Sequence, residues 1–93
     1  MKYESFNKTF NTNDNLIKEL ALKNPKDVMF NIRKMSLSAN KDFEAKINGK
    51  TIFIKENSGF EMDYNDPSIK EFIVLSDNVV IYTVFTYDSR SVN

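Results

Sequence analysis

The chain has 93 residues, and its 13 Lys and Arg side chains balance 13 Asp and Glu side chains, so the formal net charge is zero. The balance is uneven, because residues 1–55 carry 11 basic and 6 acidic side chains, whereas residues 56–93 carry 2 basic and 7 acidic ones. With no Cys, no His and only two Gly, the sequence lacks thiolate nucleophiles, the commonest general base and the clustered glycines of phosphate-binding loops. We therefore expect a protein that is not an enzyme and that holds no cofactor or metal ion.

The composition, with 41% hydrophobic and 28% charged residues, is typical of a globular protein. At this length, residues 1–93 are expected to form a single domain. Residues 2–8 are mixed and polar, unlike a secretory signal peptide, and the longest apolar runs, Phe72–Leu75 and Val79–Tyr82, are too short to cross a bilayer. These features predict a cytoplasmic protein with no membrane contact.

The first two segments differ in their hydrophobic pattern. Residues 1–12 contain aromatic side chains at spacings that fit neither a helix nor a strand, so we expect an N-terminal arm or a short strand. Residues 13–24 begin with polar side chains that can cap a helix and end before Pro25, which disfavours a helical residue in front of it. Between these ends lies one apolar stripe, formed by Leu16, Ile17, Leu20 and Ala21. Residues 13–24 are therefore predicted to be the one helix.

From Asp27 onward the hydrophobic period becomes two, which predicts antiparallel strands over residues 27–87. The alternation slips in phase near Arg33-Lys34, and a β-bulge would produce that slip. Asn48-Gly49 lies between two alternating segments and predicts a two-residue type I′ hairpin, since both turn residues need a positive φ. The register that follows places Phe43 opposite Ile54, Glu44 opposite Phe53, and Lys46 opposite Thr51.

A three-residue loop, Asn57-Ser58-Gly59, predicts that the next strand, Phe60–Tyr64, returns beside the second strand of this hairpin. That arrangement would place Lys55 between Asp42 and Glu61 in a ladder of alternating charge.

The last strands are predicted to form a hairpin, Phe72–Ser76 and Val79–Tyr87, which turns at Asp77-Asn78 and is apolar on both faces. Residues 88–93 are polar and are expected to be a frayed tail. The predicted fold is thus α+β, with one N-terminal helix packed on a four- to six-stranded antiparallel sheet.

Carboxylates are the first candidate functional group. Glu61 and Asp63 share a strand face and Asp66 follows closely, so the three could converge on a cation or a substrate. The same residues also fit a solvated polar surface, or an acidic patch that binds a protein. The acidic patch that we expect to bind a partner consists of Glu61, Asp63, Asp66, Glu71 and Asp77.

A second candidate surface combines basic and aromatic side chains. Lys46, Phe53 and Lys55 are predicted to share the outer face of the hairpin, where a nucleic-acid base could stack on the ring between two lysines. Acidic neighbours and a sequence pI near 6.2 weigh against a nucleic-acid-binding module. Nucleic-acid binding therefore stays an alternative function.

The chain resembles the small anti-CRISPR proteins with which phages and mobile elements of low-GC bacteria inhibit Cas9. The resemblance rests on its size, its Asn- and Lys-rich composition, a helix with a short antiparallel sheet, and the acidic C-terminal part with Ser76–Thr83 and Tyr87-Asp88. It implies a protein-binding inhibitor of a bacterial host defence complex, whose partner is a larger protein or ribonucleoprotein such as Cas9 with its guide RNA.

Several such inhibitors use acidic side chains to occupy the arginine-lined site where Cas9 reads its PAM, and here residues 56–77 would supply the carboxylates. A further alternative is a regulatory or structural homodimer that associates through the apolar C-terminal hairpin.

Overall fold

The structure, a computed structural model, describes residues 2–23, 27–57, 59–62 and 67–91. One short helix lies among antiparallel strands, so the fold is mixed α and β, as predicted at this level. In chain order the elements are β1 (Lys2–Phe10), α1 (Leu16–Lys23), β2 (Asp27–Ala39), β3 (Phe43–Ile47), β4 (Lys50–Ile54), β5 (Phe60–Met62), β6 (Phe72–Val74) and β7 (Val79–Ser91).

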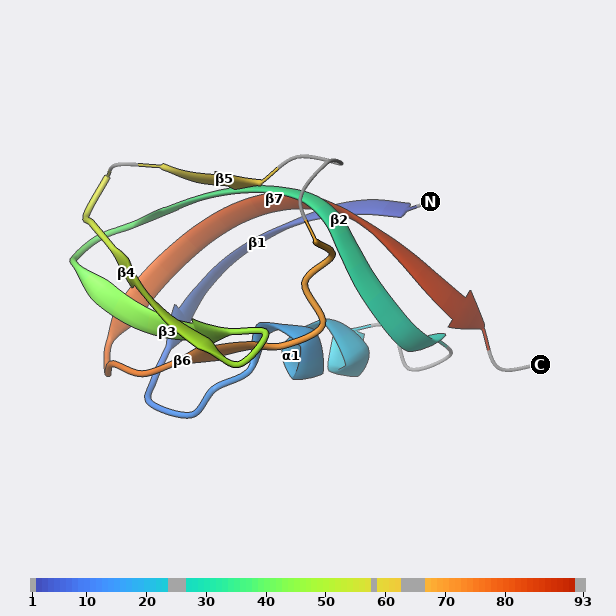
Figure 1. The fold of residues 1–93 in the computed structure, drawn as a ribbon, viewed down its shortest axis with the longest axis horizontal. Helices are drawn as coiled ribbons and strands as arrows, with labels where there is room; N and C mark the ends of the chain where they lie inside the picture. Colours follow the sequence, from blue (N-terminus) through green and yellow to red (C-terminus); the bar gives the residue numbers. More distant parts are fainter. Residues whose placement is uncertain (1, 24–26, 58, 63–66, 92–93) are drawn as a thin grey trace.

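The described strands form two sheets rather than the predicted single sheet of four to six strands. The larger sheet has the order β1-β7-β2-β5, and the smaller has the order β4-β3-β6. The long strands of the larger sheet curve over a second layer, in which the smaller sheet and α1 lie side by side (Figure 1). The apolar core is enclosed between the two layers.

Two 13-residue strands, β2 and β7, form the centre of the larger sheet. Their register shifts between Ile32 and Lys34, which confirms the predicted bulge. The prediction of a frayed tail from residue 88 is wrong as far as Ser91, because β2 begins at Asp27, which pairs with Ser91. The β2 backbone thus pairs with these polar residues, and their composition alone does not predict this pairing.

The β3–β4 hairpin follows the predicted register at all five cross-strand pairs. Its turn residues, Asn48 and Gly49, have φ angles of 49° and 83°, as a type I′ turn requires. Phe43, Ala45 and Ile54 are buried on the inner face of this hairpin.

The next strand takes a different partner from the predicted one. β5 pairs with β2 in the larger sheet, so that Glu61 lies opposite Ser36, and the predicted charge ladder with Lys55 is wrong. The loop before β5 explains the change, since the Asn57 N–H donates to the carbonyl oxygen of Ala39 at 3.2 Å. This bond holds the chain at the end of β2 instead of returning it along β4.

The predicted C-terminal hairpin is also wrong, because its two strands belong to different sheets. β6 pairs with β3, whereas β7 pairs with β1 and β2. Asp77 and Asn78 lie in the connection that crosses between the layers, and Asn78 has the positive φ, 57°, that suits such a bend. The inward side chains of both strands, including Phe72, Val74, Val79 and Ile81, are buried in the shared core.

The helix is shorter than the predicted range of residues 13–24. It starts at Leu16, because Asn15 caps it by accepting a hydrogen bond from the Ile17 N–H at 2.9 Å. The two residues before the cap bond to β6 instead, with Asn13 donating to the Val74 carbonyl at 2.8 Å and Val74 donating to Asp14 at 2.9 Å.

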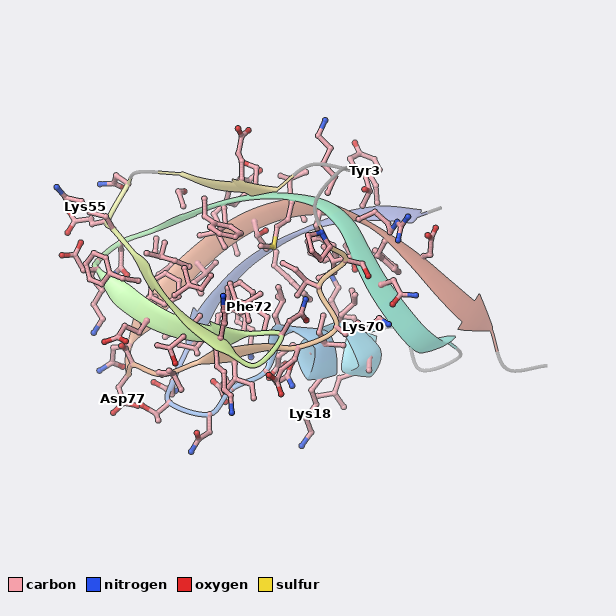
Figure 2. The ribbon with its side chains drawn as sticks, in the orientation of Figure 1. Tyr3, Lys18, Lys55, Lys70, Phe72 and Asp77 are labelled. Carbon is pink, nitrogen blue, oxygen red and sulfur yellow. The ribbon has the colours of Figure 1, made fainter. Side chains whose placement is uncertain are left out.

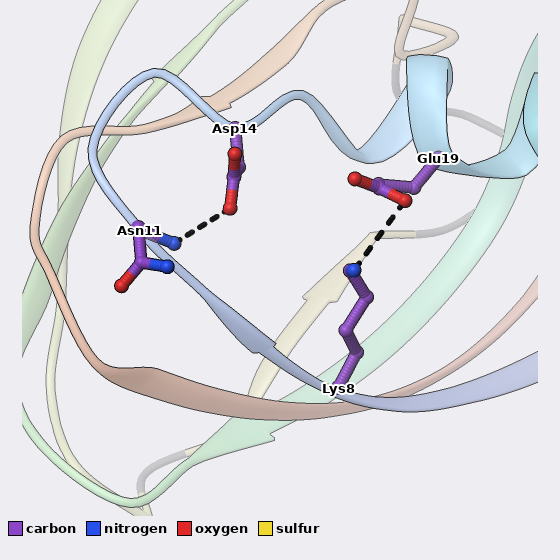
Figure 3. Close-up of polar contacts among 4 residues, drawn as sticks. All are labelled: Lys8, Asn11, Asp14 and Glu19. Carbon is purple, nitrogen blue, oxygen red and sulfur yellow. Dashed lines mark hydrogen bonds and ion pairs between the residues drawn. The ribbon is translucent and has the colours of Figure 1, made fainter.

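The N-terminal segment, for which an arm or a short strand was expected, forms the strand β1. Two ion pairs connect the helix to this strand. Lys8 Nζ lies 3.5 Å from Glu19 Oε2, and Lys23 Nζ lies 3.0 Å from Glu4 Oε1. Figure 3 shows the first pair beside the Asn11–Asp14 hydrogen bond of the loop that leads into the helix. Glu4 and Lys8 lie on the same face of β1 as the buried residues Phe6 and Phe10, so they point toward the layer that contains α1.

Candidate protein-binding surfaces

The structure places the described members of the predicted acidic patch on separate elements. Glu61 is exposed on β5 in the larger sheet. Glu71 and Asp77 flank opposite ends of β6 in the smaller sheet, and Figure 2 shows Asp77 beyond the end of that strand. Asp63 and Asp66 lie outside the described residues.

Two of these carboxylates hold the backbone in place. Glu71 Oε1 accepts the Gly49 N–H at 3.0 Å, so it supports the β3–β4 turn. Asp77 Oδ1 accepts the Thr12 N–H at 2.9 Å and joins two loops far apart in sequence. The hydrogen bonds from the Thr12 backbone and side chain lower the pKa of Asp77 below its ordinary value. Both residues thus contribute to the fold itself.

No group of three or more Asp and Glu side chains among the described residues could hold a metal ion. Within the same part of the chain, no helix is long and apolar enough to span a bilayer.

The basic and aromatic residues do share one surface. The hairpin register places Lys46 and Phe53 on the outer face of the smaller sheet, and the Phe53 side chain is 63% exposed. Lys55 is exposed directly after the end of β4. Glu44 lies directly opposite Phe53 on the neighbouring strand. A nucleic-acid strand stacked on Phe53 would therefore pass beside a carboxylate, which repels phosphate groups.

The outer apolar residues of the predicted C-terminal hairpin do not form one surface. Ile73 and Leu75 lie on the outer side of the smaller sheet, whereas Val80, Tyr82 and Val84 lie on that of the larger sheet. The apolar face proposed for a homodimer is thus divided between opposite sides of the molecule.

Part of the outer surface of the larger sheet has no charged side chains, and we call this part the uncharged face. Charged side chains border it, because Lys34 lies opposite Thr86 and Glu61 lies opposite Ser36. The uncharged face includes alternate residues of β1, β7 and β2, whose buried neighbours point into the core. The members are Tyr3, Ser5, Asn7, Thr9, Ser36, Ser38, Val80, Tyr82, Val84 and Thr86.

Strand register brings these residues into rows across the sheet. Tyr82 stands between Asn7 on β1 and Ser38 on β2, and is 51% exposed. Val84 occupies the same central position in the next row. Tyr3, at one corner, is 77% exposed and appears at the upper edge of the molecule in Figure 2. The aromatic side chain at the centre thus has hydroxyl and amide groups beside it on β1 and β2, and valine side chains beside it on β7.

Sequence patterning alone did not identify this surface, although a signal was present. Charged residues make up 28% of the chain, yet three sets of alternate positions contain none. These sets are positions 3, 5, 7 and 9, positions 36 and 38, and the even positions 80–86. Only the pairing of β1 and β2 with β7 shows that these three sets are neighbours.

No protein-family model, no curated protein and no solved structure matches this chain. Its function is therefore argued from the chemistry of its own surfaces.

Proposed function

We propose that the protein is a non-enzymatic binding protein that inhibits a larger protein partner by covering part of its surface with the uncharged face. The observation that carries this proposal is the set of ten neighbouring outward positions without a charged side chain. Depletion of charge and enrichment of tyrosine are typical of the centres of protein interfaces.

The side chains of the uncharged face suit protein recognition. Tyr82 offers a large ring with few rotatable bonds and a hydroxyl group that can donate or accept a hydrogen bond. The Ser, Thr and Asn side chains around it can bond to backbone or amide groups of a partner without the desolvation cost of a buried charge. Because these residues lie on paired strands, little backbone ordering opposes binding.

The resemblance to anti-CRISPR proteins makes a Cas9–guide complex the first partner to test. Mimicry of nucleic acid by the acidic patch is the competing mechanism, and it is less supported because Glu71 and Asp77 already accept backbone hydrogen bonds. The two mechanisms involve different residues, so variants separate them.

The test introduces one charge at the centre of the uncharged face. Tyr82→Glu is expected to weaken inhibition of purified Cas9–guide complexes at least tenfold, because the partner would have to bury an unpaired carboxylate. Lys18→Gln is the matched control, since it changes the net charge by the same amount at an exposed position of α1. Inhibition of DNA cleavage is measured for both variants and for the unmodified chain, and affinity capture from bacterial host extracts widens the search to other defence complexes.

Three results would contradict the proposal. If Tyr82→Glu inhibits as well as Lys18→Gln, the uncharged face is not the binding surface. If reversal of Glu61, Asp63 and Asp66 to Lys abolishes inhibition while Tyr82→Glu does not, acidic mimicry explains the activity. If light scattering shows a dimer that Tyr82→Glu dissociates, a second copy of the chain covers this face instead.

A further inference from the structure

The edges of the two sheets differ in how well they are protected from pairing with an additional strand. β1 carries two inward-pointing charged residues, Glu4 and Lys8, and both form ion pairs with α1. Such inward charges discourage the addition of another strand. The edge of β6 is occupied by the segment before the helix, through the hydrogen bonds between Asn13, Asp14 and Val74. Within the described part of the chain, β5 has three residues, Phe60–Met62.

The remaining edge, β4, offers free backbone groups. In a hairpin closed by a two-residue turn, the residues that flank the turn form a hydrogen-bonded pair, and such pairs then alternate along the strands. Lys50, Ile52 and Ile54 therefore bond to β3, while the N–H and C=O groups of Thr51 and Phe53 point away from it. Among the described residues, none occupies these outward groups of Thr51 and Phe53.

A groove runs beside this edge, in the space between β4 and β5. It has a volume of about 420 Å³. Its lining is mainly apolar, with contributions from Ile47, Ile52, Phe60 and Ile69, and residues Lys50 and Glu61 also line it. The Lys50 side chain shares the strand face of Ile52, whereas the Glu61 side chain shares the outward face of Ser36. Because Ile52 points inward while Thr51 and Phe53 point outward, the groove lies on the inner side of the free edge.

We propose that β4 binds an extended segment of a partner protein as an added antiparallel or parallel strand, with one apolar side chain of that segment in the groove. The free N–H and C=O groups of Thr51 and Phe53 supply backbone hydrogen bonds, and the groove selects alternate side chains, as in other cases of strand addition. Lys50, whose side chain is on the groove side of β4, favours a segment with an acidic residue near it.

This second binding site is independent of the uncharged face. β4 belongs to the smaller sheet, whereas the uncharged face lies on the outer side of the larger one. Loss of peptide binding and loss of inhibition can therefore be measured in separate variants.

The probe is a phage-displayed library of random decamer peptides, selected on the immobilised full chain. Peptides that bind are synthesised with a fluorescent label, and their affinities are measured by anisotropy. Thr51→Pro removes the outward N–H of this edge position without removing a hydrogen bond to β3, and proline is tolerated on edge strands. We expect it to weaken binding roughly three- to tenfold, as the loss of one hydrogen bond predicts. Thr51→Val, which keeps the N–H and the branched shape, is expected to bind like the unmodified chain.

A second measurement does not depend on the folding of any variant. Single N-methyl groups are placed in turn along the best peptide, and each blocks one backbone donor. Strand addition predicts that methylation weakens binding at every second residue, because alternate donors face the β4 edge. Tyr82→Glu is expected to leave peptide affinity unchanged.

The proposal is overturned if no peptide binds with a Kd below about 100 μM. It is equally overturned if N-methylation has no period of two, or if Thr51→Pro and Thr51→Val bind alike. A dimer that Thr51→Pro dissociates would identify a second copy of the chain, rather than a partner segment, as the occupant of this edge.

Discussion

Asn48 performs two tasks at the tip of the β3–β4 hairpin. Its backbone has the positive φ that the turn requires. Its side-chain oxygen accepts the N–H groups of Lys70 at 2.9 Å and Glu71 at 3.2 Å, and its Nδ2 donates to the Ser68 carbonyl at 2.9 Å. One amide group therefore fixes the segment that leads into β6.

We predict that Asn48→Gly lowers the free energy of unfolding by about 1–3 kcal/mol, since it keeps the turn conformation but removes three hydrogen bonds. The measurement is urea unfolding, in which the midpoint falls while the slope stays constant. Asn57→Gly is the matched control, because Asn57 also has a positive φ, 54°, and its side chain forms no hydrogen bond within the described part of the chain. Equal losses in both variants would assign the effect to glycine itself.

Asp77 gives the loop contact with Thr12 a dependence on pH. Its pKa lies below the ordinary value of 3.8, chiefly because the carboxylate accepts the Thr12 backbone N–H. A carboxyl group whose pKa falls on folding stabilises the folded state above its unfolded pKa, and this stabilisation is lost as the pH falls through the lowered value. Asp77→Asn should thus be less stable than the unmodified chain at pH 7, and the difference should shrink as the pH falls from the ordinary pKa through the lowered one. Urea unfolding of both proteins across this range checks the sign, and a gap that is constant with pH would contradict it.

At the scale of elements, the helix is fixed to the edge of the larger sheet by side chains that are only partly buried. Lys23 connects the two in two ways, since its Nζ lies 3.0 Å from Glu4 and 4.7 Å from the centre of the Phe6 ring. The other pair, Lys8 with Glu19, has side chains that are 40% and 25% exposed, so water screens much of its attraction.

We predict that Lys8→Glu and Glu19→Lys each lower stability by up to about 1 kcal/mol, and that the double variant recovers at least half of the combined loss. A double-mutant cycle by urea unfolding measures this coupling. It should weaken in about 1 M salt, because partly exposed ion pairs are screened. Additive losses would mean that the two side chains do not stabilise each other.

Local chemistry made some elements predictable from the sequence. The Asn48-Gly49 turn needs positive φ at both residues, so the register of β3 with β4 followed directly. The bulge near Arg33 was predictable because the alternation of buried residues changes phase there. The capped apolar stripe likewise indicated a helix, although its first turn was placed too early because several polar residues could serve as the cap.

The division into two sheets could not be predicted in this way, because it depends on contacts between distant segments. Asp77-Asn78 has the composition of a hairpin turn, yet the Asp77 carboxylate and the Asn78 N–H bond to Thr12 and Asn11, which hold the connection between the layers. The uncharged face was missed for the same reason, since its three strands are neighbours only in the folded chain. Of the predicted acidic patch, Glu71 and Asp77 have backbone partners that no sequence pattern signals.

At the scale of the whole molecule, one core joins both layers. Phe10 of β1, Phe72 of β6 and Phe85 of β7 are almost fully buried and belong to the same apolar cluster. The label in Figure 2 places Phe72 near the middle of the molecule. Removal of one of these rings should therefore weaken both sheets together.

We predict that Phe72→Ala lowers the free energy of unfolding by about 3–5 kcal/mol, because it leaves a cavity in the shared core. Phe53→Ala, at a position 63% exposed, should change it by no more than about 0.5 kcal/mol. Tryptophan is absent, so unfolding is followed by tyrosine fluorescence and by far-ultraviolet circular dichroism. A loss of similar size in both variants would show that Phe72 is not enclosed by both layers.

The pairing of the first strand with the last has a consequence for biosynthesis. Each residue of β1, from Lys2 to Phe10, is matched to a residue of β7 between Val79 and Tyr87. A ribosome that adds about 5–20 residues per second completes β7 several seconds after β1. During that interval the N-terminal segment has no partner strand, and its aromatic residues are accessible to chaperones or to another nascent chain. Assembly of the larger sheet must therefore wait until the C-terminal strand has left the exit tunnel.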